Sequence, residues 1–476
     1  MAMSIDIAML LLLQVSLLLF SASHAQLARK IAAQASHNHD NVGTQHDVSS
    51  TGHKSFSVAP TTMSNPHLEM VKDTDGDEES YITNSSSSII IGDLPTNATR
   101  LLLSNSFTCP QAFFIFGDSL TDTGNIQLLA PGLAATTLNY PYGESYTFTN
   151  EPGHNRYSDG RLIVDFIAQA FGFPFFEPIL LELDNGFQTD YTHGVNFAYS
   201  GATIQPDITK NPIYLQLELD QFFVYKEALF SSPQPSTPLS FLPTAAYLIP
   251  EIGGNDFFYA YSRGASPQTV IDEIVPHSLN LLVSAVEQLH ESGARTIIVG
   301  NQPTQGCSPT ILTAFSGSGP YDKIGCLDEY NKVSQVFNIG LEHALTNLQE
   351  NYKADGTLII QFDFYNAIIE LFTNPTQYGF NPNNRFEVCC GFGRAYNYNV
   401  NVTCGDSGNV SLSTGGTQFV NISTAPNPKE HIEWDGVHFT QAAYKVIASF
   451  FLSGQFFISP IGFNFKHLCN LDFSQF

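Results

Sequence analysis

The sequence predicts an α/β protein in which helices cover both faces of a central parallel sheet. Short apolar segments alternate with helical patterns from about residue 109 onward. Two of these apolar segments stop abruptly at glycine and polar residues, at 117–119 and at 253–256. Such alternation is typical of βαβ units, whose crossover helices pack on the faces of a parallel sheet.

The predicted elements follow one another through the rest of the chain. Apolar side chains recur at helical spacing within 160–171, which predicts an amphipathic helix. Ser266 before Pro267 is typical of a capped helix start, and Pro276 predicts a kink or a later start in the same helix. The predicted strands are 112–116, 245–252, 295–300 and 356–362, and the predicted helices are 160–171, 267–292, 365–372 and 442–452.

Length and charge limit the classes of partner. The chain has 476 residues, 43% of them hydrophobic, which is enough for a sizeable core. It carries 19 Lys and Arg against 44 Asp and Glu, for a formal net charge of −25. This balance argues against nucleic acid and against anionic membrane surfaces, because both require clustered basic side chains.

The N-terminal part is predicted to be separate from the folded domain. Residues 1–25 resemble a signal peptide, with an apolar stretch at 7–20 and small residues before a cleavage site after Ala25. The alternative, an uncleaved anchor, is disfavoured because the apolar stretch is too short to span a bilayer well. Residues 26–108 are polar and poor in aromatics, which predicts a disordered extension or propeptide. We expect one domain over 109–476, because no repeat or second boundary is found there.

The cysteines and glycosylation sequons agree with a secretory route. The seven cysteines fit no zinc-binding spacing. Cys307 and Cys326 are placed to close a short loop, and Cys389 or Cys390 is placed to pair with Cys404. The odd count leaves at least one thiol free or paired between chains, and the state of Cys109 and Cys469 stays open. The predicted glycan acceptors are Asn84, Asn97, Asn401, Asn409 and Asn421.

Polar residues follow two of the predicted strands, where ligand sites of parallel α/β sheets form. Ser119 directly follows the first strand, and Asn255 follows the second. Near the C-terminus, Asp435 and His438 lie three residues apart. A serine needs a base to become a good nucleophile, and that base needs an acceptor to orient it. Each of these residues alone also has a structural interpretation. Ser119 would lie in a common turn, His438 would be a surface or core histidine, and Asn255 would cap a helix.

Four segments in order carry a resemblance to a known family. They are FIFGDSLTDTGN (114–125), GVNFAYSGAT (194–203), IGGND (252–256) and WDGVHFTQAAY (434–444). Together they resemble the blocks of the GDSL lipase/esterase family, also called SGNH hydrolases, and the intervening segments resemble its secreted plant branch. The resemblance covers roughly residues 109–460 and implies a flavodoxin-like three-layer α/β/α sandwich with a central parallel sheet. Ser119 is not within a G-x-S-x-G motif, which disfavours the α/β-hydrolase elbow.

The resemblance also implies roles for individual residues. Ser119 would be the nucleophile, His438 the general base and then acid, and Asp435 the residue that orients His438. The backbone N–H groups of Ser119 and Gly201 and the side-chain amide of Asn255 would form the oxyanion hole. Three donors facing one developing charge is an arrangement that stabilises a tetrahedral intermediate.

Asp122 and Thr123 are expected to brace the loop after Ser119 and take no part in the reaction. Trp434, the only tryptophan, is expected to pack beside its loop, with contact to an acyl group as the alternative.

The expected function is a secreted serine esterase or lipase that hydrolyses carboxylic esters and needs no cofactor or metal. An acyltransferase with the same acyl-serine and an alcohol acceptor is the first alternative, and a non-catalytic binding or defence protein on the same fold is the second. The expected location is extracellular, in the cell wall or apoplast, or in the vacuole. The expected partner is an ester with an apolar or phenolic acyl group, while the oligomeric state stays open. A loop of four aromatics lines the entrance or packs against itself: Tyr140, Tyr142, Tyr146 and Phe148.

Overall fold

A computed structural model describes residues 107–131, 137, 139–146, 148, 156–181, 192–206, 213–231, 239–393, 395–402, 404–405, 407–411 and 417–473. The predicted signal peptide, most of the predicted extension, and the sequons at Asn84 and Asn97 lie outside these ranges. Among the described residues, no helix is both long enough and apolar enough to cross a membrane.

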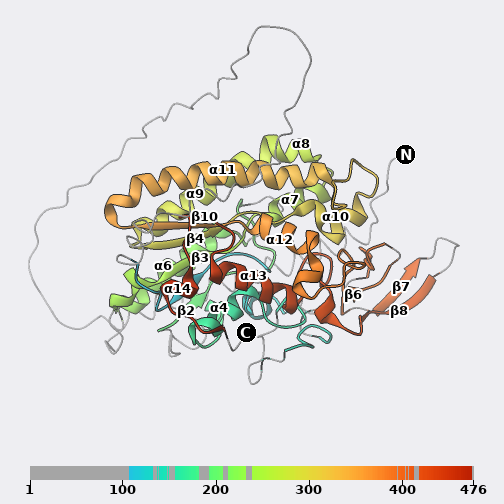
Figure 1. Ribbon diagram of the computed structural model, residues 1–476, viewed down its shortest axis with the longest axis horizontal. Helices are drawn as coiled ribbons and strands as arrows, with labels where there is room; N and C mark the ends of the chain where they lie inside the picture. Colours follow the sequence, from blue (N-terminus) through green and yellow to red (C-terminus); the bar gives the residue numbers. More distant parts are fainter. Residues whose placement is uncertain are drawn as a thin grey trace, which may run out of the picture.

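Strands and helices alternate along the described chain (Figure 1). The strands are β1 (Phe113–Ile115), β2 (Gly194–Asn196), β3 (Ala246–Ile249), β4 (Thr296–Gly300), β5 (Leu358–Phe362), β6 (Cys390–Gly391), β7 (Ser407–Ser411), β8 (Thr417–Asn421), β9 (Ser423–Thr424) and β10 (Phe457–Ser459). The helices are α3 (Asn125–Leu129), α4 (Ile163–Phe171), α6 (Leu215–Ser231), α7 (Gly254–Ser262), α8 (Pro267–Thr269), α9 (Val275–Glu291), α10 (Pro309–Ala314), α11 (Asp328–Tyr352), α12 (Phe364–Thr373), α13 (Gln441–Ser453) and α14 (Phe465–Leu468).

The main sheet has the strand order β10-β5-β4-β3-β1-β2. The five strands β2, β1, β3, β4 and β5 pair in parallel, in the order of a flavodoxin-like sheet. The prediction of a parallel sheet needs one correction, because β10 joins the edge antiparallel to β5. Antiparallel edge strands are common on otherwise parallel sheets. This three-residue strand carried too little strand pattern to be predicted.

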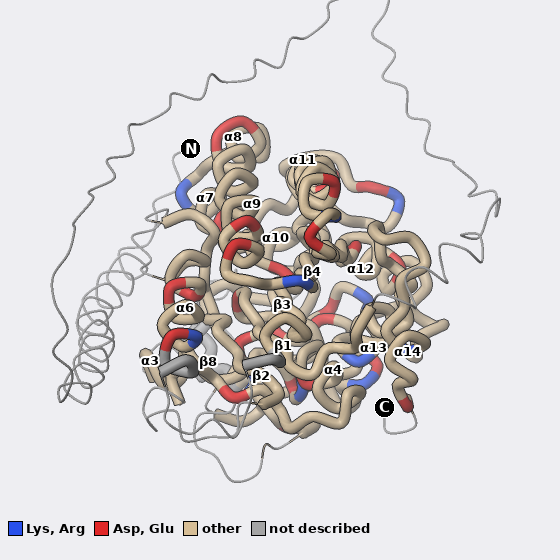
Figure 2. The backbone as a smooth tube through the Cα atoms, turned by 90° about the vertical axis from the view of Figure 1, so that its left-hand side faces the viewer, with Lys and Arg blue, Asp and Glu red and all other residues tan. Residues whose placement is uncertain are grey.

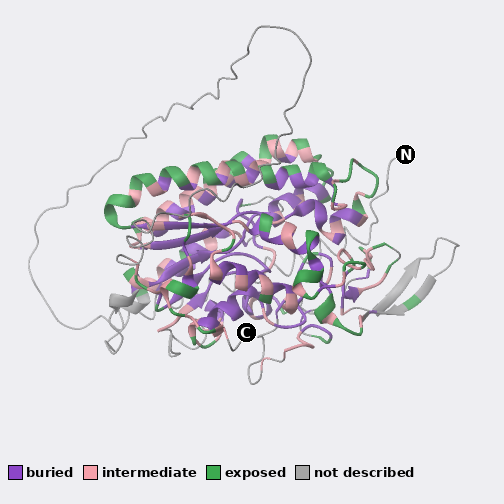
Figure 3. Ribbon diagram, viewed as in Figure 1, coloured by how far each residue is buried: buried purple, intermediate pink, exposed green. Residues whose placement is uncertain are grey.

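Alternation of side chains along the strands produces two cores. Phe114 and Phe116 belong to one core with residues of α6, α9 and α11, whereas Phe113 and Ile115 belong to the other with residues of α4, α12 and α13. Successive strand residues point to opposite faces, so each face of the sheet buries its own set. Figure 3 shows the buried strands between these layers and the exposed outer side of α11. The predicted three-layer sandwich is confirmed.

The predicted helix over 267–292 is divided into three parts. Ser266 caps α8, since its side chain accepts a hydrogen bond from Thr269 N at 3.1 Å. A π-helical turn, Val270–Ile274, then precedes α9, and Pro276 lies in the first turn of α9. Proline lacks an N–H and is tolerated in a first turn, and the backbone stays helical from α8 through the π-helical turn into α9.

Three disulfides connect distant and local parts of the described chain. Cys109–Cys469 joins residues 360 positions apart, Cys307–Cys326 closes the predicted short loop, and Cys390 pairs with Cys404. Cys389 keeps a free, buried thiol. The open choice between Cys389 and Cys390 is therefore decided for Cys390, and both Cys109 and Cys469 are paired.

Asp and Glu residues recur along α6, α8 and α11 of the described chain, as the colouring of the backbone in Figure 2 shows. An acidic surface repels polyanions at a distance.

Candidate active site

The predicted site residues gather at the carboxyl ends of β1 and β3. The chain leaves β1 at Gly117 and leaves β3 at Pro250, and the two strands are neighbours in the sheet. β2 lies on the other side of β1, so the strand order reverses here. This is the switch point where parallel α/β folds form ligand sites.

A tight turn presents Ser119 at the end of β1. The backbone N–H groups of Thr121 and Asp122 both donate to Asp118 O, at 3.0 and 2.9 Å. Gly117 has φ of 141°, and a Cβ there would lie 2.8 Å from Glu251 O, so only glycine fits. Ser119 is 6% exposed, which leaves its hydroxyl partly sheltered from water.

His438 connects Ser119 to Asp435. His438 Nε2 lies 2.8 Å from Ser119 Oγ, and His438 Nδ1 lies 2.8 Å from Asp435 Oδ2. A turn closes the Asp-x-x-His segment, because the backbone N–H groups of Val437 and His438 donate to Asp435 Oδ1 at 3.1 and 3.0 Å. This local turn therefore positions the Asp435 carboxylate next to the His438 imidazole, and no contact from a distant strand is required. The structure brings all three predicted residues into one hydrogen-bonded series.

Asp435 is charged in this environment. Burial acts to raise its pKa, but the charge and hydrogen bonds of His438 and a hydrogen bond from Tyr142 together hold the pKa below its ordinary value. An ionised acceptor at Nδ1 fixes the tautomer that leaves Nε2 free to accept a proton from Ser119. An imidazolium formed during the reaction is therefore stabilised by the Asp435 charge.

The three predicted oxyanion donors come from three loops that meet beside Ser119. Asn255 Nδ2 donates to Ala202 O at 2.9 Å and to Asp118 Oδ2 at 3.2 Å. The amide therefore bridges the loop that contains Gly201 and the loop that contains Ser119. The alternative that Asn255 caps a helix is wrong, because Gly253 is the N-cap of α7.

Asp122 braces these loops, as expected. Its carboxylate accepts from the backbone N–H groups of Gly124, Asn125 and Ile126 at 2.8, 2.7 and 3.1 Å, and from Ser200 N at 2.7 Å. Four bonds to one carboxylate tie the turn after Ser119 to the Gly201 loop. Thr123 is held as well, since Arg156 donates to its carbonyl at 2.6 Å.

Two aromatic residues complete the site and had no specific signal in the sequence. Tyr142 Oη donates to Asp435 Oδ2 at 2.7 Å, so this side chain does more than line an entrance. The ring of Tyr157 packs on His438 with 4.8 Å between centroids. No local sequence pattern predicts the contact of Tyr142 with Asp435, because the two residues are 293 positions apart.

Of the other aromatic residues in the 140–148 loop, one is exposed to solvent and two pack against neighbouring rings. Tyr140 is 74% exposed. Tyr146 and Phe148 pack on each other at 4.9 Å and both contact Phe175, which favours the packing interpretation over an entrance. Trp434 is fully buried and lies 5.8 Å from Tyr142 between ring centroids. Its predicted packing role is confirmed.

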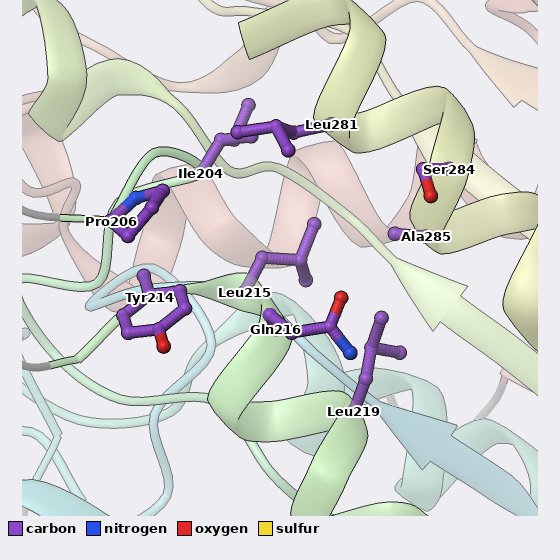
Figure 4. Close-up of a pocket in the computed structure, with 9 residues that line it drawn as sticks. All are labelled: Ile204, Pro206, Tyr214, Leu215, Gln216, Leu219, Leu281, Ser284 and Ala285. Atoms are coloured by element: carbon purple, nitrogen blue, oxygen red, sulfur yellow. The ribbon is translucent and has the colours of Figure 1, made fainter. Parts of the chain in front are cut away.

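A separate apolar pocket of about 170 Å³ lies between α6 and α9 (Figure 4). Its wall includes Ile204, Tyr214 and Leu219, and none of the Ser119, Asp435 and His438 side chains lines it. No group of three or more His, Cys, Asp or Glu suited to a metal ion occurs within the part of the chain that the structure describes.

Comparison with known proteins shows the family to which the chain belongs. The profile of the family "GDSL-like Lipase/Acylhydrolase" matches residues 113–451. The GDSL esterase/lipase ENOD8 of Medicago truncatula is 36% identical over 74% of this chain and 88% of its own length. Acetylajmalan esterase of Rauvolfia serpentina is 33% identical over 74% of this chain and 87% of its own length. A GDSL esterase/lipase of Arabidopsis thaliana is 35% identical over 74% and 84%. The chain therefore belongs to the GDSL-like lipase/acylhydrolase family and is a carboxylic-ester hydrolase.

Proposed function

We propose that the chain hydrolyses esters through an acyl-serine intermediate on Ser119. Ser119 Oγ attacks the carbonyl carbon while its proton passes to His438 Nε2, and the alcohol then leaves with that proton. Water attacks the acyl-serine, His438 takes the proton of the water and returns it to Ser119, and the carboxylic acid is released. The observation that carries this proposal is the unbroken series from Asp435 through His438 to Ser119, at 2.8 Å for each step.

The negative charge of each tetrahedral intermediate needs donors. We assign this role to the N–H groups of Ser119 and Gly201 and to the amide of Asn255. The contacts of Asn255 with Ala202 O and Asp118 Oδ2 support the assignment, because they place its amide between the two loops that supply the other donors. Donors arranged before the reaction stabilise charge without the cost of reorganising solvent.

The proposed substrate is an ester with an apolar or phenolic acyl group. Two aromatic side chains contact residues of the proposed site: Tyr157 packs on His438, and the hydroxyl of Tyr259 approaches Gly201 O at 3.5 Å. Val437, beside His438, is 37% exposed. Apolar walls with a few polar groups are typical of sites for small organic ligands.

Hydrolysis is proposed over acyl transfer because the compared relatives are named esterases. The two differ only in whether water or an alcohol takes the acyl group from Ser119. A product assay with and without a candidate alcohol separates them. A non-catalytic binding role would not require the joined Ser119, His438 and Asp435.

Secretion is part of the proposal. Three disulfides among the described cysteines support it, since disulfides persist in oxidising compartments. We propose residues 1–25 as the signal peptide and 26–108 as a polar extension of the domain over 109–476. Exposed Asn401 is a suitable glycan acceptor, and Asn409 and Asn421 lie on β7 and β8. N-terminal sequencing and glycopeptide mapping of the secreted protein test these assignments.

The first test of the proposed function is labelling with a fluorophosphonate, which reacts with activated serines. A labelled peptide that contains Ser119 is expected in mass spectra, together with turnover of p-nitrophenyl esters. A folded protein that is neither labelled nor active would contradict the acyl-serine proposal.

Asn255→Ala is expected to lower kcat by about 10²- to 10³-fold, the range for loss of one oxyanion donor. The bond gained in the transition state disappears, while ground-state binding is little affected, so KM should stay close to the wild-type value. Steady-state kinetics on a p-nitrophenyl ester measure both parameters. Labelling at Ser119 should persist, and an unchanged kcat would remove Asn255 from the oxyanion hole.

Tyr142→Phe is expected to lower kcat by roughly 10-fold, since it removes one charge-assisted hydrogen bond worth about 1.5–3 kcal/mol when buried. Asp435 would lose the donor that holds Oδ2 while its bonds to His438 remain. Tyr146→Phe is the matched control, because it removes a tyrosine hydroxyl from the same loop. Equal effects of the two substitutions in kinetic assays would argue that Tyr142 only packs the loop.

A further inference from the structure

A pair of buried carboxyl groups lies behind Ser119 and has no part in the series from Asp435 to Ser119. Asp118 follows β1 and is 3% exposed, and Glu251 follows β3 and is 1% exposed. The two side chains are in hydrogen-bond contact with each other. None of the ion pairs found among the described residues includes either of them.

Such a pair has to hold a proton. Two carboxylates accept hydrogen bonds only, so contact between them without a nearby cation requires one O–H donor. Asp118 already accepts two N–H groups, from Leu120 at 3.0 Å and from Asn255 Nδ2 at 3.2 Å. Glu251 accepts from Gly254 N at 3.2 Å and has a side-chain hydrogen bond with Gln302. Because the Asn255 amide donates to Asp118, the charge is assigned to Asp118 and the proton to Glu251.

The electrostatics of the pair agree with this assignment. Burial raises the pKa of Glu251 well above its ordinary value, and the charge of Asp118 raises it further. Burial also raises the pKa of Asp118, but its hydrogen bonds to Glu251 and Leu120 act in the opposite direction. Glu251 is consequently the carboxyl of the pair that holds the proton more strongly.

We propose that Glu251 is a positioning residue whose proton is donated to Asp118 and thereby controls how the Asn255 amide is presented to the oxyanion. The proposal rests on the oxyanion role of Asn255 in the proposed function. Each hydrogen of Asn255 Nδ2 has an acceptor in the free enzyme, Ala202 O at 2.9 Å and Asp118 Oδ2 at 3.2 Å. The longer bond, to Asp118, is the one that the oxyanion competes with.

The proton on Glu251 decides that competition. While Glu251 donates to Asp118, the negative charge of Asp118 is shared, and its hold on the Asn255 amide is weakened. Without the proton, two carboxylates repel each other and Asp118 binds the amide more strongly. A second negative charge near Ser119 also disfavours the oxyanion. Turnover should therefore require the protonated pair and should decline as pH rises through the pKa of Glu251.

Other groups face this pair and have to be separated from it. Gln302 contacts Glu251. Asp118 interacts electrostatically with His438, Glu218 of α6, Tyr259 of α7 and Tyr444 of α13. Burial raises the pKa of Tyr259 to about 12 and holds that of Tyr444 well above its ordinary value, so neither tyrosine titrates below pH 10.

Glu251→Gln and Glu251→Leu in the full-length protein test the proposal. Glutamine keeps Oε1 for Gly254 N and offers Nε2 as a donor to Asp118 that no base removes. We expect Glu251→Gln to retain kcat at the pH optimum of the wild type and to lose the decline of kcat/KM on the alkaline side of that optimum. Leucine has no donor, and a misplaced Asn255 should lower its kcat on the order of 10²-fold with KM little changed.

Thermal unfolding gives a readout that is independent of catalysis. The pKa of Glu251 is higher in the folded state than in the unfolded state. Its contribution to folding stability is therefore complete below the unfolded pKa and is lost as pH rises through the folded pKa. The wild-type Tm should therefore fall relative to that of Glu251→Gln as pH rises above the ordinary titration range of a glutamate. Glu218→Gln is the matched control, because it removes another buried carboxyl near Gly117 but should keep the alkaline decline.

Three results would each overturn the proposal. The alkaline decline of kcat/KM could be the same in Glu251→Gln and in wild type, or the decline could disappear in Glu218→Gln instead. A folded Glu251→Leu protein could also keep full activity. Rates on a p-nitrophenyl ester, corrected for spontaneous hydrolysis, supply these comparisons. A wild-type protein without turnover or fluorophosphonate labelling would contradict the proposed function, and the Tm comparison would still report whether Glu251 holds the proton.

Discussion

Ser119→Ala is expected to lower kcat by about 10⁶-fold, the size of effect seen when the nucleophile of a serine hydrolase is removed. His438 Nε2 has the Ser119 hydroxyl at 2.8 Å as its partner, and the substitution leaves the base with no proton to take from a nucleophile. The fold should survive, because one hydroxyl is lost and its net contribution to stability is about 1 kcal/mol. Turnover of a p-nitrophenyl ester and fluorophosphonate labelling measure the loss.

Ser200→Ala is the matched control for this experiment. Ser200 lies on the neighbouring loop, where its backbone N–H donates to Asp122 at 2.7 Å, and its hydroxyl is not bonded to His438. Labelling should persist in Ser200→Ala and vanish in Ser119→Ala. Wild-type turnover in a folded Ser119→Ala protein would exclude the acyl-serine mechanism.

His438→Ala is expected to lower kcat by an amount similar to that of Ser119→Ala. Nucleophile and base act as a unit, so removing either one removes the same proton transfer. For the same reason, the double variant should be no slower than either single variant. The reactivity of Ser119 toward the fluorophosphonate should fall as well, because the hydroxyl is no longer activated. A double-mutant cycle on kcat, with labelling rates, provides the measurement.

His431→Ala supplies the comparison from the same segment. His431 is also buried, but it contacts Asn384 through Nε2, 3.0 Å away, and Glu387 O through Nδ1. This variant should lose stability and keep kcat. Two outcomes would show that His438 is not the base. His438→Ala could retain a hundredth of wild-type kcat, or the fold-loss of kcat in the double variant could equal the product of the fold-losses in the two single variants.

The elements with strong local patterns could be predicted from the sequence. The four predicted strands occur within one to three residues of their predicted limits, because each is a short apolar run ended by glycine, proline or a polar residue. β2 and β10 were not predicted, because neither contains the longer apolar run that marks β1, which is of the same length. The 25-residue helix α11 was also missed. Its polar outer side dilutes the apolar pattern, and only packing against the sheet shows which side is buried.

Local sequence patterns predict the fold class, and the resemblance to the family adds Ser119, Gly201, Asn255, Asp435 and His438 as candidate site residues. The folded chain was needed to show that Cys390 rather than Cys389 pairs with Cys404, that Tyr142 holds Asp435, and that Glu251 meets Asp118. Glu251 and Asp118 are 133 positions apart and become neighbours because β1 pairs with β3. Contacts of this kind depend on which strands lie side by side, and no short stretch of sequence contains that information.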